Sequence, residues 1–141
     1  MSTPTHSVSV AGAIYDESAD SFLVIQRRDN GEWQLPGGVL ELDETIEEGV
    51  IREVLEETGV VVKPVKLTGV YKNMIRKIVS LVFLCEVVSG DLQINDEAQK
   101  VEWMAAVRVP EMMSEAFAVR LLDAISDNTP VIRTNDGTNL I

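Results

Sequence analysis

One stretch of the chain, from Gly38 to Val60, constrains the fold more than any other. Thr45 is followed three residues later by Glu48, which is the pattern of a helix capping box. Gly59 is a C-terminal stop signal, because glycine readily adopts the left-handed conformation that ends many helices. The sequence therefore predicts a helix of about four turns between these two signals.

Three glutamates share one face of the predicted helix. Glu53, Glu56 and Glu57 stand at positions i, i+3 and i+4, with Arg52 at the margin of the same face. Like charges at this spacing destabilise an isolated helix by roughly 0.2–0.5 kcal/mol per pair, so a cation is expected to compensate. Hard divalent ions such as Mg²⁺ and Mn²⁺ prefer carboxylate oxygens. The alternative is an ordinary solvated face, as in most glutamate-rich helices.

Two further features of the helix concern its packing. Ile46, Val50 and Val54 are spaced by four residues and are expected to form an apolar stripe against the core. Gly49 lies one turn before Glu53, and glycine inside a helix costs about 1 kcal/mol relative to alanine. We therefore expect a metal ion or a phosphate to approach the helix closely at Gly49.

The stretch resembles the Nudix box, whose pattern is G-x5-E-x7-R-E-U-x-E-E-x-G-U with U a bulky aliphatic residue. Every specified position is matched, by Gly38, Glu44, Arg52, Glu53, Val54, Glu56, Glu57, Gly59 and Val60. The resemblance covers about residues 7–126. It implies the Nudix fold, an α/β fold in which a mixed β-sheet is sandwiched between α-helices.

The resemblance also implies a chemistry, since Nudix enzymes use a metal-activated water to hydrolyse a nucleoside diphosphate linked to another group X. The expected metal ligands are Glu53, Glu56 and Glu57, together with the carbonyl of Gly37, which matches a ligand of the MutT branch. Either Glu53 or Glu56 is also the candidate base. Arg52 matches the arginine that orients a catalytic glutamate.

Two more carboxylates are assigned through the resemblance. Glu44 is expected to reach Arg52 or an outer water of the metal. Nudix enzymes usually supply a further carboxylate from the loop before the strand that contains Trp103. Glu97 precedes Trp103 at the spacing found in MutT-type enzymes and is assigned as a catalytic and metal-binding residue, whereas the adjacent Glu102 is expected to be structural.

Substrate contacts are expected from three places. The segment Trp33–Gly38 ends in proline and two glycines that allow close backbone approach, and in Nudix proteins it is part of the site, so Trp33 and Gly38 are assigned to substrate binding. Arg27 is expected to face the helix side and contact substrate, or else to pair with Asp29 or Glu32. Arg76 and Lys77, in the most basic stretch of the chain, are assigned as a substrate lip, or else protect a strand edge.

The remaining chain predicts one domain, residues 1–141. Strands are expected at 7–15, 22–28, 60–71, 77–88 and 99–105, with a short strand near Trp33 and a second amphipathic helix over 110–125. Residues 127–141 form a turn-rich tail, for which a further strand, an oligomer contact and disorder all stay open.

Composition narrows the possible partners. A formal net charge of −11 argues against binding a nucleic-acid polymer, which relies on clustered Lys and Arg. The absence of a long apolar run and of a signal peptide leads us to expect a cytoplasmic protein without a membrane partner.

Cys85, the single cysteine, lies in an apolar run and is expected to be buried. The sequence leaves open whether the protein forms a homodimer.

The substrate is narrowed by elimination within the family. ADP-ribose enzymes carry a proline, and diadenosine-polyphosphate enzymes a tyrosine, in a window after the box that here reads Ile75 to Ile78. Coenzyme A and NADH signatures are also absent, which favours Mg²⁺- or Mn²⁺-dependent cleavage of nucleoside triphosphates to monophosphate and pyrophosphate. The alternatives are an ADP-ribose, nucleotide-sugar or dinucleotide diphosphatase. A non-catalytic ligand-binding module is a further alternative, although such modules generally lose box glutamates.

Overall fold

A mixed β-sheet forms the centre of the structure, a computed structural model that describes residues 2–141. The elements in chain order are β1 (Ser7–Asp16), β2 (Ser21–Arg27), β3 (Trp33–Gln34), β4 (Gly37–Val39), α1 (Ile46–Thr58), β5 (Val60–Asn73), β6 (Ile78–Gly90), β7 (Ala98–Ala105), the 3₁₀ turn η1 (Ala106–Arg108), α2 (Val109–Met112), α3 (Glu115–Ala124) and β8 (Val131–Asn135). The five long strands predicted from the sequence are present, with ends that differ by no more than two residues.

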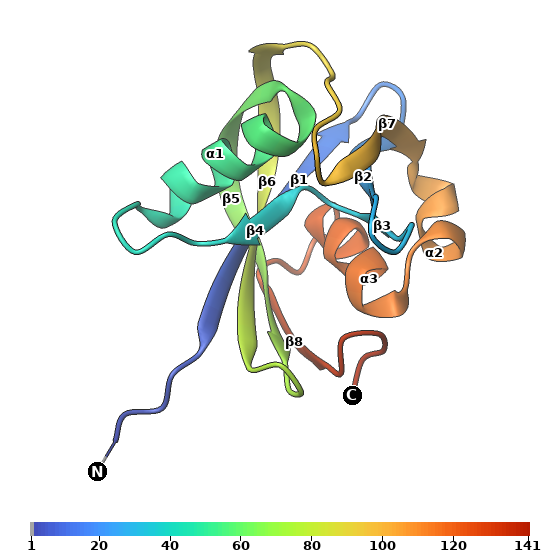
Figure 1. Ribbon diagram of the computed structural model, residues 1–141. Helices are drawn as coiled ribbons and strands as arrows, with labels where there is room; N and C mark the ends of the chain where they lie inside the picture. The colour runs from blue at the N-terminus through green and yellow to red at the C-terminus, as the bar shows by residue number, and fades with distance from the viewer. Residues whose placement is uncertain (1) are drawn as a thin grey trace.

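The sheet has the strand order β3-β2-β1-β6-β5-β8, and β4 and β7 pair with β1 and β2 respectively. The pairs β1–β6 and β5–β8 are parallel, and the other pairs are antiparallel. Helix α1 covers one face of the sheet, whereas α2 and α3 lie on the other side (Figure 1). This arrangement confirms the expected mixed sheet between helices.

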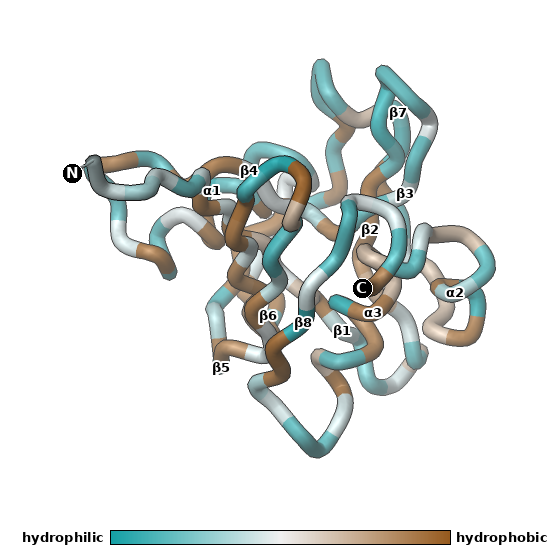
Figure 2. Tube along the Cα trace, turned by 90° about the horizontal axis from the view of Figure 1, so that it is seen from below, coloured by the Kyte–Doolittle hydropathy of each residue, from teal (hydrophilic) through white to brown (hydrophobic). Residues whose placement is uncertain are grey.

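The core is divided in two by the sheet, because successive residues of a strand point to opposite faces. On β1, Val10 and Ile14 pack in the cluster around α1, whereas Ala11 and Ala13 pack in the cluster around α2 and α3. Figure 2 shows hydrophobic residues concentrated on the central strands and hydrophilic residues on the outer loops. Cys85 is 2% exposed on β6, as expected, and burial raises the pKa of its thiol to about 12.

Both ends of α1 agree with the sequence prediction. Thr45 Oγ1 accepts a hydrogen bond from the Glu48 N–H at 3.2 Å, and Glu48 Oε1 accepts one from the Thr45 N–H at 2.8 Å. The helix ends at Gly59, which has a φ of 83° and so adopts the left-handed conformation. The capping box and the glycine stop signal are therefore confirmed.

The predicted apolar stripe of α1 is correct at two of its three positions. Val50 and Val54 are fully buried against the sheet, whereas Ile46 is 41% exposed. Ile46 is the first residue of the helix, next to the exposed residues of the preceding loop. The expectation that Ile46 packs in the core is therefore wrong.

Gly49 lies where the segment before the helix packs closely on α1. A Cβ added at Gly49 would lie 2.7 Å from Leu40 Cδ1 and 3.0 Å from Glu44 Oε1. The segment that precedes the helix folds back on Gly49, so a larger residue there would have to displace the ends of these side chains. Packing thus offers a second reason for Gly49, and the close approach of a metal or a phosphate at this position stays a prediction.

The helix expected over residues 110–125 is broken into α2 and α3. Met113 is extended, with φ −120° and ψ 150°, and Ser114 occupies the N-cap position of α3. The Ser114 carbonyl accepts hydrogen bonds from the N–H groups of Phe117 and Ala118, which starts a new helix. Serine is a favoured N-cap residue, although the Ser114 side chain makes no capping hydrogen bond here. Within residues 2–141, every helix is too short or too polar to cross a membrane.

The C-terminal tail forms the last strand of the sheet. Strand β8 pairs in parallel with β5, in a register that places Val131 opposite Gly69 and Asn135 opposite Asn73. Arg133 makes two hydrogen bonds of 2.8 Å to the carboxylate of Asp123 on α3. Of the three possibilities left open for this tail, a further strand is the correct one, so the folded core extends past residue 126.

Candidate active site

The second half of α1 and the segment before β7 bring four glutamates to one place. Glu53, Glu56 and Glu57 come from α1, and Glu97 precedes β7. Together they line a cavity of about 290 Å³, named here the inner cavity. Its other lining residues are Ile25, Arg27, Gln34, Gly37, Gly38 and Val39. The structure thus gathers all four glutamates that the sequence assigned to the site.

Arg52 ties the acidic face of α1 to the preceding loop. Its guanidinium donates to both carboxylate oxygens of Glu44, at 2.8 and 2.6 Å, and to Glu53 Oε1 at 2.9 Å. A longer hydrogen bond of 3.3 Å reaches Glu56. The hydrogen bonds from Arg52 lower the pKa of Glu44 to about 2, so Glu44 stays ionised. Arg52 is therefore placed to fix the orientation of Glu53, and Glu44 to hold Arg52.

Glu57 lies deepest in the inner cavity, with 7% of its surface exposed. Its carboxylate accepts a hydrogen bond of 3.3 Å from the N–H of Gly37. Burial raises the pKa of Glu57 to about 8, and the nearby charges of Glu53 and Glu97 add to this shift. The negative charge at this position is thus destabilised by its surroundings.

Gly38 allows the chain to run directly beside Glu53. A Cβ at Gly38 would lie 2.5 Å from Glu53 Oε1, a distance too short for any side chain. Glu53 is itself buried, which raises the pKa of its carboxyl, while its hydrogen bond from Arg52 acts in the opposite direction. The glycine thus lets the β4 backbone form one wall of the inner cavity against a carboxylate.

Asn95 positions the segment that carries Glu97. Its Nδ2 donates to the carbonyls of Glu56 and Glu57 at 3.0 and 2.9 Å, and its Oδ1 accepts from the N–H groups of Glu97 and Ala98 at 2.8 and 3.0 Å. One side chain therefore links the last turn of α1 to the start of β7. This link holds Glu97 beside the glutamates of the helix.

The donor set of the inner cavity fits a hard divalent cation. Carboxylate oxygens are the preferred ligands of Mg²⁺ and Mn²⁺, and a cation would favour the charged form of Glu57, whose pKa is raised first by burial and then by the charges of Glu53 and Glu97. In the part of the chain that the structure describes, no three acidic, histidine or cysteine side chains already converge as a ligand cluster. The fit therefore rests on the chemistry of the donors and their shared cavity.

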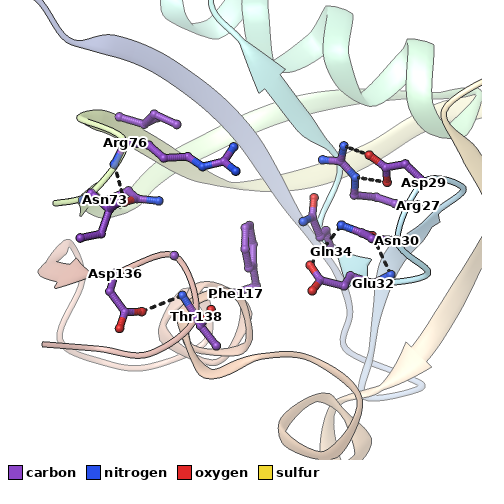
Figure 3. A pocket seen from close by; sticks show the side chains of 13 residues that line it. Arg27, Asp29, Asn30, Glu32, Gln34, Asn73, Arg76, Phe117, Asp136 and Thr138 are labelled. Carbon is purple, nitrogen blue, oxygen red and sulfur yellow. Dashed lines mark hydrogen bonds and ion pairs between the residues drawn. The ribbon is translucent and has the colours of Figure 1, made fainter.

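A larger cavity of about 520 Å³, named here the outer cavity, adjoins the inner one. The two cavities share Arg27 and Gln34 as lining residues. The rest of the outer cavity is lined by Asp29, Asn30, Glu32, Asn73, Ile75, Arg76, Ile78, Phe117, Asp136, Gly137 and Thr138. Figure 3 shows that these side chains come from the β2–β3 turn, the β5–β6 turn, α3 and the C-terminal turn.

Comparison with known proteins identifies the family. The model of the NUDIX domain matches residues 5–124. The chain belongs to the Nudix family of hydrolases. It is 52% identical over 140 residues to a MutT-like protein of Streptomyces ambofaciens, an alignment that covers 99% of this chain and 90% of that protein.

Two further Nudix relatives bear on the comparison. An ADP-ribose pyrophosphatase of Methanocaldococcus jannaschii is 37% identical over 113 residues, covering 75% of this chain and 66% of that protein. The crystal structure of an ADP-ribose pyrophosphatase from Streptococcus suis superposes with a TM-score of 0.78 at 23% identity, covering 93% of this chain and 100% of that chain. The latter likeness establishes the shared Nudix fold, as expected from the sequence.

Two residues assigned to substrate binding are placed elsewhere. Trp33 is 8% exposed and packs in the core cluster beneath α3, because its side chain points to the opposite face of β3 from Gln34. Lys77 lies in the β5–β6 turn, where its Nζ donates to the carbonyl of Met74. Neither Trp33 nor Lys77 lines the inner or the outer cavity, so the structure gives no support to their roles in substrate binding, which stay predictions.

Arg27 makes the ion pair with Asp29 that was one of its two interpretations, and its contact with substrate stays a prediction. Its guanidinium forms a bidentate pair with Asp29, with hydrogen bonds of 2.9 and 2.6 Å, and the residue also lines both cavities. Arg76 lines the outer cavity, as expected for a substrate lip. Glu102 is exposed on β7 and does not line either cavity.

Several residues of the site were not found from the Nudix box. Asn95 stands two residues before Glu97, and an Asn at this spacing is the pattern of an Asx turn, so a local signal existed. Phe117, Asp136 and Thr138 carried no such signal, because they reach the outer cavity only through the packing of α3 and β8 on the sheet.

Proposed function

We propose that this Nudix hydrolase uses Mg²⁺ or Mn²⁺ to cleave the pyrophosphate linkage of nucleoside diphosphate-X substrates. The favoured substrates are nucleoside triphosphates, with nucleoside monophosphate and pyrophosphate as products. The observation that carries this proposal is the gathering of Glu53, Glu56, Glu57 and Glu97 around one cavity. That cavity adjoins a larger one bordered by Arg27 and Arg76.

The chemistry divides among the residues of the inner cavity. The four glutamates would hold the metal, which would lower the pKa of a bound water and neutralise phosphate charge. Glu53, oriented by Arg52, and Glu56, whose side chain is 59% exposed, are the candidates to accept the proton of the attacking water. Arg27, at the border of the two cavities, would contact the phosphates.

The substrate preference is supported by charge and by the lack of other family signatures. Arg27 lines both cavities and would offer its guanidinium to the phosphates of the substrate, while the outer cavity balances its two arginines with Asp29, Glu32 and Asp136. ADP-ribose is the second candidate, because the relative from Methanocaldococcus jannaschii is named an ADP-ribose pyrophosphatase. The two candidates differ in the product released beside the nucleoside monophosphate, which is pyrophosphate from a triphosphate and ribose 5-phosphate from ADP-ribose.

Hydrolysis in ¹⁸O-labelled water tests the proposal. The protein is incubated with nucleoside triphosphates, ADP-ribose and nucleotide sugars, each with Mg²⁺, with Mn²⁺ and with chelator. We expect turnover only with metal, and nucleoside monophosphate carrying the label with unlabelled pyrophosphate. Ribose 5-phosphate released faster than pyrophosphate would favour the ADP-ribose alternative. Full turnover in chelator, or no turnover of any compound with metal, would refute the proposal.

A further inference from the structure

The C-terminal turn forms a wall of the outer cavity that the assignment of the Nudix box does not explain. Asp136, Gly137 and Thr138 line this cavity together with Phe117 of α3 (Figure 3). Asp136, Gly137 and Thr138 lie beyond residue 124, where the match to the NUDIX domain model ends, whereas Phe117 lies within the match. The wall therefore combines a helix of the matched domain with a turn that follows it.

The C-terminal turn is held firmly against α3 and β5. The Thr138 carbonyl accepts a hydrogen bond of 2.9 Å from the Ala116 N–H, and the Leu140 N–H donates to Glu115 Oε1 at 2.7 Å. Both contacts lie in the first turn of α3, immediately before Phe117. On the other side, the Asn135 carbonyl accepts from the N–H of Met74, at 2.9 Å, in the β5–β6 turn. The turn is thus a defined surface.

Phe117 presents a fixed aromatic ring at this wall. The guanidinium of Arg120 lies 4.5 Å from the centroid of the Phe117 ring and 5.2 Å from that of Tyr71. Arg120 is only 7% exposed, and its Nε donates to the Ala116 carbonyl at 3.0 Å. A buried cation between two rings holds Phe117 in place, while the half-buried Phe117 still borders the cavity.

We propose that the outer cavity binds the base of a nucleotide, with the base stacking on Phe117 beside the Asp136–Thr138 turn. An aromatic ring is a general platform for planar heterocycles, because every base has a π face. The volume of about 520 Å³ falls in the range of small-molecule sites. This inference rests on the proposed function, since it places the other end of the same substrate.

The direction of the substrate follows from the shared border of the two cavities. Arg27 and Gln34 line both, so a base at Phe117 can extend its phosphates past them toward the glutamates. Arg76 projects into the outer cavity in Figure 3, and its guanidinium makes no ion pair with any of residues 2–141. It is therefore free to contact the nucleotide.

Binding measurements separate the contribution of the base to the affinity from that of the phosphates. Titration calorimetry with Mg²⁺ compares inorganic tripolyphosphate with the α,β-methylene triphosphates of adenosine, guanosine, cytidine and uridine. We expect at least one nucleotide to bind roughly 10-fold more tightly than tripolyphosphate, within the range typical of aromatic stacking. Phe117→Leu should remove most of this difference, and Phe117→Tyr should retain it.

A second pair of variants tests the C-terminal wall without touching the core. Thr138→Trp fills the cavity from an exposed position of the turn and should reduce nucleotide affinity while leaving tripolyphosphate affinity unchanged. The matched control, Ile132→Trp, changes an 83% exposed residue of β8 outside the cavity and should have no effect. If Phe117→Leu lowers stability too far, the comparison of Thr138→Trp with Ile132→Trp decides whether the base binds in the outer cavity.

The outcomes distinguish this inference from the proposed function. Equal affinity of wild-type protein for nucleotides and tripolyphosphate, or nucleotide affinity unchanged in Thr138→Trp, would overturn the base site. Base-dependent binding without hydrolysis of any cleavable nucleotide would instead refute the proposed function and leave the base site standing.

Discussion

The four glutamates of the inner cavity are chemically alike but occupy different surroundings. Glu57 is buried and accepts a hydrogen bond from Gly37, whereas Glu53 is held by Arg52. Glu56 lies at the opening with a 59% exposed side chain. Differences in burial and hydrogen bonding, rather than residue type, thus separate a buried carboxylate from one that is accessible to water.

Substituting glutamine for single glutamates tests these roles, because it keeps the size and removes the charge. We expect Glu56→Gln to lower kcat by at least ~10²-fold, a typical scale for loss of general-base assistance. Glu57→Gln should also lower activity and weaken Mg²⁺ binding. Steady-state kinetics over a metal titration measures both effects. Glu102→Gln, outside the cavities, is the control, and wild-type rates in both site variants would show that the box is not catalytic here.

At the scale of elements, the site depends on connections between segments that are distant in the chain. Asn95 joins the end of α1 to the start of β7, and Arg52 joins α1 to the loop that precedes it. Each connection is made by one side chain with several hydrogen bonds. The positions of Glu97 and Glu53 therefore rest on residues that need not touch substrate.

Asn95→Ala should loosen the segment that carries Glu97. We expect kcat/KM to fall on the order of 10-fold, with a stability loss of about 1–3 kcal/mol from the lost hydrogen bonds. The control is Asp16→Ala, which removes a similar side-chain-to-backbone turn contact between β1 and β2. If both variants lose stability equally but also lose activity equally, the link between Asn95 and Glu97 has no specific role.

At the scale of the whole molecule, the net charge of −11 and the buried glutamates act together. The folded chain concentrates carboxylates around the inner cavity, where burial raises the pKa of Glu57 and Glu53. Folding without metal therefore costs free energy, because it buries these carboxylates and brings them together. A bound divalent cation would offset this cost and so stabilise the folded protein.

The raised pKa of Glu57 makes the stability of the metal-free protein depend on pH. The pKa of Glu57 rises from 4.5 to about 8 on folding, so between these values the folded state holds a proton that the unfolded state releases. The free energy of unfolding without metal should therefore fall as pH rises from about 6 to about 8. Thermal melts in chelator measure this slope, and Glu57→Gln should flatten it because an amide does not titrate.

The same melts with Mg²⁺ provide the complementary measurement. Metal at about 100 times its Kd should stabilise the folded state by about 2.7 kcal/mol, because it binds the folded form. The gain should be smaller in Glu57→Gln and unchanged in Glu102→Gln. Two results would contradict this account. One is a melting temperature that saturating Mg²⁺ leaves unchanged, and the other is an equal pH dependence of stability in wild type and Glu57→Gln.

Much of the site could be predicted because its signals are local. The capping box at Thr45, the stop at Gly59 and the shared face of Glu53, Glu56 and Glu57 depend only on residue spacing within one helix. The alternation along β2 likewise placed Arg27 on the side of α1, where it lines the inner cavity. The family pattern added Glu97, which stands outside the helix.

The remaining features were decided by contacts between distant segments. Leu40 folds back on α1 beside Gly49, and Trp33 turns into the core beneath α3. Phe117 and Thr138 border the outer cavity because β8 pairs with β5 and the C-terminal turn binds the start of α3. Spacing along the chain determines hydrogen bonds within a helix or turn, whereas strand order determines which distant side chains share a cavity. The sequence by itself therefore determined the acidic helix face and its caps, and only the tertiary structure decided what surrounds that face.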